Sequence, residues 1–122
     1  MRISGIAAGL ALLALAPASA SADAEVRGGT YAAVGTNLDG SPYSGTARIK
    51  ITSNSTCEIV WKTGGATSRG ICMRDSDSFA AAYRMGEAVG LVIYKIAPDG
   101  SLDGVWTIAG LSGAGTETLT PQ

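Results

Sequence analysis

The chain has 122 residues, with nine basic and ten acidic side chains and no histidine. This length suits a single domain. Without histidine, Ser-His-Asp and Cys-His catalysis and histidine-ligated metal sites are excluded. Because the charges are balanced, the sequence also predicts no basic patch that would bind nucleic acid or an anionic membrane surface.

The first 22 residues have the pattern of a cleaved secretory signal peptide. One arginine precedes the apolar run 3–16, and Pro17 and small alanines and serines follow it. A membrane anchor is the alternative, but the apolar run is shorter than the ~20 residues that span a bilayer. We therefore expect cleavage within 20–24, a domain over 23–122 with no membrane insertion after cleavage, and a periplasmic or secreted location.

The rest of the chain consists of short β-rich runs separated by turn residues, with a spacing typical of all-β proteins. Asp39-Gly40, after the first run, is a strong hairpin signal. In the second run, Ile49 and Ile51 alternate with charged residues, which indicates a half-buried strand. The predicted strands cover, in chain order, residues 30–36, 44–52, 56–62, 67–73, 78–84, 89–96, 102–108 and 116–120.

The two cysteines are placed symmetrically about Gly64-Gly65. Glycine accepts the positive φ of a tight turn, so this pair is expected to join two strands as a hairpin. Counting outward from the turn places Cys57 opposite Cys72 and Trp61 opposite Ser68. An exported chain with two cysteines is expected to carry one disulfide, and two free buried thiols are the alternative.

The connections between the strands indicate the architecture. Pro98 with Asp99-Gly100 ends the most apolar run, 89–96, in a tight turn. Eight short strands with short connections predict an all-β, eight-stranded antiparallel up-and-down meander. Closure into a small barrel, on the plan of lipocalins and avidins, would remove the exposed edges. A two-sheet sandwich is the alternative.

The sequence shows no pattern of a catalytic, cofactor-binding or metal-binding site. Asp75 and Asp77 form a D-x-D, but the glycine-centred loop and distant glutamate of a calcium site do not follow. The glycine-rich loop 109–115 lacks the lysine of a phosphate loop. We therefore expect a protein that acts by binding, without a cofactor, and not an enzyme.

Two features suggest where binding would occur. Trp61 and Trp106 are expected on inward faces, largely buried. In the strand 89–96 both alternate faces are apolar, and a small barrel can hide only one of them. We take Val92 and Tyr94 as the candidate binding surface, covered by a protein partner or by a second copy in a homodimer. A set of aromatic side chains could instead line a ligand site or simply fill the core: Tyr31, Tyr43, Trp61, Tyr83, Tyr94 and Trp106.

Two stretches, GTYAAVGTNLDGSPYSGTARI and GLVIYKIAPDGSLDGVWTIAGLSGAGTETLTP, resemble a family of small exported bacterial proteins. Its members share N-x-D-G-S-x-Y-x-G and D-G-x-L-x-G-x-W-T segments, and are often labelled fibronectin-binding proteins or left uncharacterised. The resemblance implies adhesion to a host or matrix protein such as fibronectin. A carrier of a small apolar ligand and a structural or inhibitor-like periplasmic domain are the alternatives. A filled barrel interior would exclude the carrier.

Overall fold

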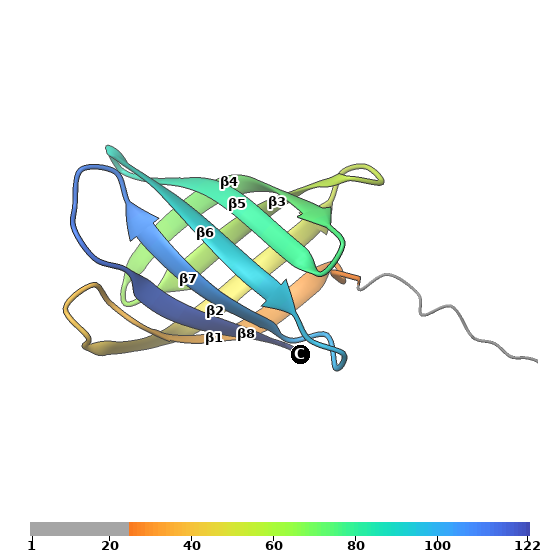
Figure 1. Cartoon of the computed structure of the whole chain (residues 1–122), viewed down its shortest axis with the longest axis horizontal. Coiled ribbons are helices and arrows are strands. Elements are labelled where there is room, and N and C mark those ends of the chain that lie inside the picture. Colours follow the sequence, from red (N-terminus) through yellow and green to blue (C-terminus); the bar gives the residue numbers. More distant parts are fainter. Residues whose placement is uncertain (1–24) are drawn as a thin grey trace, which may run out of the picture.

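A computed structural model describes residues 25–122, which form an eight-stranded antiparallel barrel (Figure 1). Each strand pairs with its neighbour along the chain, and β8 closes on β1. The predicted closed barrel is therefore confirmed, and the two-sheet sandwich is wrong. The strands are β1 (Gly29–Thr36), β2 (Pro42–Ile51), β3 (Thr56–Thr63), β4 (Ala66–Asp75), β5 (Ser78–Met85), β6 (Ala88–Ile96), β7 (Leu102–Ile108) and β8 (Gly115–Pro121).

The predicted signal peptide, residues 1–22, lies outside the described residues. Within 25–122, no helix is long and apolar enough to cross a membrane. Each predicted strand agrees with the observed one to within two residues at either end. The agreement reflects local turn chemistry: Gly64 and Gly65, between β3 and β4, have φ values of 56° and 82°, which glycine adopts without a steric penalty.

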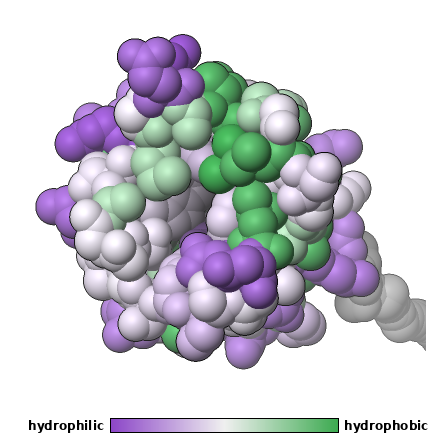
Figure 2. Space-filling view, turned by 90° about the vertical axis from the view of Figure 1, so that its left-hand side faces the viewer, coloured by the Kyte–Doolittle hydropathy of each residue, from purple (hydrophilic) through white to green (hydrophobic). Residues whose placement is uncertain are grey.

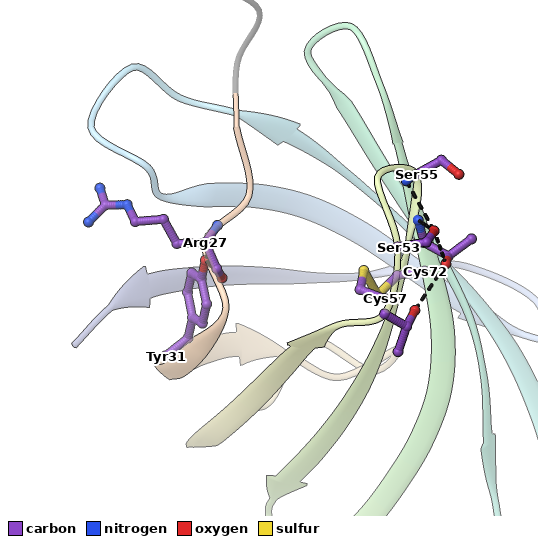
Figure 3. The surroundings of a disulfide bond; sticks show 8 residues. Arg27, Tyr31, Ser53, Ser55, Cys57 and Cys72 are labelled. Atoms are coloured by element: carbon purple, nitrogen blue, oxygen red, sulfur yellow. Dashed lines mark hydrogen bonds between the residues drawn. A yellow bond between two sulfur atoms is a disulfide. The ribbon is translucent and has the colours of Figure 1, made fainter.

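The hairpin of β3 and β4 has the predicted register and carries the predicted disulfide. Cys57 pairs with Cys72 and Trp61 with Ser68. The two cysteines form a bridge with their Cα atoms 5.0 Å apart, and both are buried. Figure 3 shows the sulfur atoms on the inner side of these strands, facing the part of the barrel that holds Tyr31. A disulfide of this kind fits a location outside the reducing cytoplasm.

One half of the barrel interior is a packed core. At this end the chain before β1 folds against the barrel, and the Tyr31 hydroxyl donates a hydrogen bond of 2.6 Å to the backbone oxygen of Arg27. The Arg27 guanidinium donates to the backbone oxygen of Asp99, in the β6–β7 turn, at 3.2 Å. Together with the disulfide, buried side chains fill this half: Tyr31, Ala33, Ala47, Ile49, Ile59, Phe79, Ile96, Leu102 and Leu119.

Strand β6 shows which of its two apolar faces points inward. Val92 and Tyr94 are 2 % and 1 % exposed and lie inside the barrel. The outward face carries Val89, Leu91 and Ile93, which are 44 %, 59 % and 59 % exposed. The expectation that Val92 and Tyr94 form an outer surface was therefore wrong, because barrel closure buries that face. Any contact of these two residues with a ligand takes place inside the barrel.

Candidate ligand-binding site

The other half of the barrel contains a cavity of about 230 Å³. It opens between the β1–β2, β3–β4 and β5–β6 turns and the β7–β8 loop, and Figure 2 shows the hollow at this end of the molecule. Of the six aromatic residues proposed from sequence, Tyr31 lies at the opposite end. The other five line the cavity together with one acidic residue: Tyr43, Trp61, Tyr83, Tyr94, Trp106 and Glu117.

Glu117 is the polar centre of this site. Strand β8 alternates inward Gly115, Glu117 and Leu119 with outward threonines, so its period places a carboxylate inside the barrel. Glu117 is only 5 % exposed. Its Oε1 accepts a hydrogen bond from the Tyr43 hydroxyl at 2.9 Å. Its Oε2 accepts one from Trp61 Nε1 at 2.9 Å and a second, short one from the Tyr94 hydroxyl.

The tyrosines of the cavity keep their protons at ordinary pH. Burial, and secondly the negative charge of Glu117, raise the pKa of Tyr83 to about 12. The same two causes, in the same order, raise the pKa values of Tyr43 and Tyr94, and the hydrogen bonds to Glu117 add to the effect. The Tyr83 hydroxyl donates to the backbone oxygen of Thr107 at 2.9 Å. The tyrosines are therefore neutral donors, and Glu117 supplies the negative charge of the cavity.

The cavity rings are placed by small residues on neighbouring strands. Tyr94 pairs across strands with Gly104, and a Cβ atom at Gly104 would lie 2.5 Å from the Tyr94 Cδ1 atom. Tyr83 pairs with Gly90, where a Cβ atom would lie 2.2 Å from the Tyr83 Cζ atom. Each ring thus occupies the space that a side chain on its partner would fill. The complete set of pairs is Tyr43 with Gly35, Trp61 with Ser68, Tyr83 with Gly90, Tyr94 with Gly104 and Trp106 with Gly115.

The rings meet edge to face. Trp61 and Tyr83 have centroids 5.4 Å apart and an interplanar angle of 62°, and Tyr43 and Trp106 have values of 6.2 Å and 67°. Such perpendicular aromatic pairs are energetically favourable. The predicted burial of Trp61 is confirmed at 5 % exposure. Trp106 was expected to be equally buried but is only partly so, because it lies at the open end of the barrel.

Glu117 is the site residue that sequence reasoning missed. The sequence did contain a signal for it. On the predicted strand 116–120, alternation places Glu117 on the same face as Leu119, and an apolar residue such as Leu119 indicates the inward face. The arrangement of one carboxylate and five aromatic rings can bind a compact ligand by ring contacts and hydrogen bonds. Within residues 25–122 no group of three or more histidine, cysteine or acidic side chains is placed to hold a metal ion.

Redesigned and de novo designed β-barrels are among the solved structures that resemble this chain. The redesigned barrel mFAP1, bound to DFHBI, is 20 % identical, with a TM-score of 0.66 over 76 % of this chain and 93 % of that one. The redesigned barrel b11L5F_LGL is 19 % identical, with a TM-score of 0.66 over 78 % and 90 %. At this identity the similarity shows the fold alone. No protein-family model and no curated protein matches the chain, so its resemblance to fibronectin-binding proteins stays a prediction.

Proposed function

We propose that the protein binds a small ligand in the cavity beside Glu117 and acts as a carrier without turning the ligand over. The observation behind this proposal is that one half of the barrel is packed and the other half is hollow, with a cavity of about 230 Å³. This volume lies somewhat below the range of roughly 300–1,000 Å³ typical of ligand pockets, so a fragment-sized compound fits best. Export to the periplasm or the medium would suit a carrier.

The chemistry of the lining supports a binding role. Aromatic walls with a few polar groups at fixed positions are the usual composition of small-molecule sites. The cavity rings are held by cross-strand packing and by hydrogen bonds such as that of Tyr83 to Thr107, so the site is formed before a ligand arrives. The DFHBI-bound barrel mFAP1 supports the proposal independently, because it is a barrel of the same architecture that is bound to a small molecule.

Ligand binding can be tested with a variant that fills the mouth of the cavity. Ala66 lines the cavity at the start of β4, and the next residue, Thr67, points outward. We expect at least one compound from a panel of small aromatics, DFHBI included, to quench tryptophan fluorescence saturably with one site. Ala66→Trp should abolish this binding, and Thr67→Trp should leave it intact. Absence of binding across the panel, or equal binding by both variants, would contradict the proposal.

A second candidate function is contact with another protein through the outer face of the barrel. The outer apolar patch consists of Ile71, Met73, Leu91, Ile93 and Val105, which are 52–69 % exposed. The strand registers place these residues in two adjacent rows across β4, β5, β6 and β7, completed by alanines of β5. A continuous apolar surface of this kind favours a protein contact, as adhesion to fibronectin would require.

The outer apolar patch can be tested independently of the cavity. Leu91→Lys and Ile93→Lys place charges in the patch, whereas Val34→Lys changes an equally exposed valine on β1. Binding to immobilised fibronectin should be lost in the first two variants and kept in the third. Sedimentation velocity at increasing concentration would show whether a second copy covers the patch instead. A monomer that binds no fibronectin would rule out both partners that the sequence suggested.

A further inference from the structure

Among residues 25–122, Glu117 has no cationic partner that would balance its charge. In the part of the chain that the structure describes, no lysine or arginine lines the cavity. Within residues 25–122 the only salt bridge joins Lys95 to Asp77 at the surface. A carboxylate with 5 % exposure is costly to hold inside a protein unless a positive charge or several hydrogen bonds compensate it. Three neutral donors supply part of that compensation, and no ion pair with a described residue supplies the rest.

The hydrogen bonds of Glu117 leave room for one more donor. A carboxylate offers about four acceptor positions, two on each oxygen. Oε2 accepts from both Trp61 and Tyr94, so its positions are occupied. Of the donors in residues 25–122, only Tyr43 bonds Oε1, and its hydroxyl also lies 3.2 Å from the backbone oxygen of Thr116. One acceptor position on Oε1 is therefore open beside the cavity.

The walls around this position are suited to a positive charge. Ring faces of tryptophan and tyrosine attract cations through their quadrupole, most strongly where water is excluded. Trp61, Tyr83 and Tyr94 are all less than a tenth exposed, and Tyr43 and Trp106 form an edge-to-face pair at the open end of the barrel. Because the tyrosines stay neutral, the walls carry no charge that would compete with Glu117 for a cation.

From these observations we infer that the cavity is selective for a small organic cation, an ammonium group with at least one N–H on an aromatic or apolar body. The N–H donates to the open position of Glu117 Oε1, and the body lies against the faces of Trp61 and Tyr83. The inference rests on the proposed ligand-binding function and specifies its ligand class. It differs from the apolar-ligand carrier that the sequence left as an alternative, because the charge of the ligand decides its affinity.

The test compares three ligands of similar size and different charge, benzylammonium, benzyl alcohol and benzoate, each titrated into the full-length protein by calorimetry. We expect benzylammonium to bind ~10-fold or more tightly than benzyl alcohol, which corresponds to a charged hydrogen bond and a cation–π contact. Benzoate should not bind. Equal or tighter binding of benzyl alcohol would overturn the cation selectivity and leave the ligand-binding proposal standing. Binding of all three that is unaffected by Ala66→Trp would overturn both.

A variant isolates the role of the charge. Glu117→Gln keeps the size of the side chain and one acceptor oxygen but removes the charge. Its affinity for benzylammonium should fall to that for benzyl alcohol, while affinity for benzyl alcohol itself changes little. If Glu117 only cross-links strands, the variant would leave the ratio of the two affinities unchanged, which would overturn the inference. The comparison of the three ligands on the unmodified protein decides the question even if this variant does not fold.

Discussion

Replacement of Gly104 by alanine tests how the cavity is built. A Cβ atom at this position would lie 2.5 Å from Cδ1 and 2.9 Å from Cε1 of Tyr94, so the ring has to move. Tyr94 is 1 % exposed and donates a short hydrogen bond to Glu117. Any movement of the ring therefore disturbs both the packed interior and the polar centre of the cavity.

The expected cost follows from these contacts. Overpacking of a well-packed interior costs about 1–3 kcal/mol. A hydrogen bond to a charged group contributes roughly 1.5–3 kcal/mol, and a weakened bond loses part of this. Alanine also reduces the conformational entropy of the unfolded chain, which offsets about 0.4–1 kcal/mol of this cost. We expect Gly104→Ala to lower the free energy of unfolding by about 3 kcal/mol, measured by urea denaturation with the disulfide intact.

Two controls separate the effect of the Tyr94 ring on stability from the effect of the backbone change. Gly28→Ala makes the same chemical change where a Cβ atom would meet only ordinary contacts, the Ile49 oxygen and the Ile51 Cγ1 at 3.5 Å, so stability should change little. In a Tyr94→Ala background the ring is gone, and of the three nearest atoms only the backbone oxygen of Ile93, at 3.0 Å, remains. The cost of Gly104→Ala should then fall to about 1 kcal/mol. An equal cost in both backgrounds would refute the idea that Gly104 exists to make room for Tyr94.

The buried ring of Trp61, the disulfide and the raised pKa values of the tyrosines can each be tested by a separate measurement. Trp61→Ala should lower the free energy of unfolding by about 3–5 kcal/mol, measured by denaturation, because a buried ring leaves a cavity; a loss below 1 kcal/mol would contradict this burial. Serine at both Cys57 and Cys72 should cost roughly 2–4 kcal/mol without abolishing the fold, since the bridge closes a loop of sequence separation 15; two titratable thiols in freshly isolated, denatured protein would refute the bridge. All four tyrosines have pKa values raised above 10.0, and that of Tyr83 is raised to about 12. Because the unfolded chain releases these protons first, stability should be intact below pH 10 and fall as the pH rises from 10 towards 12. Absorbance at 295 nm should then show less tyrosinate at pH 10.5 in the folded protein than in urea, and Tyr83→Phe should reduce the difference.

The strands and turns were determined by the sequence alone, because they depend on neighbours along the chain. Gly64-Gly65 accepts the positive φ values of its turn, and the spacing of the cysteines about it fixes the register of β3 and β4. Alternation with a period of two likewise groups residues by face within each strand. These signals are local, so they predicted eight strands, their antiparallel order and the disulfide.

Which face of a strand points inward was decided only by the tertiary structure. In β6 both faces are apolar, so alternation could not tell that Val92 is buried and Ile93 exposed; barrel closure and the pairing of Tyr94 with Gly104 settle that choice. The site depends on distant contacts in the same way. The hydroxyl and indole groups that bind Glu117 are 23, 56 and 74 residues away in sequence, and they meet because closure brings β2, β3, β6 and β8 around one interior.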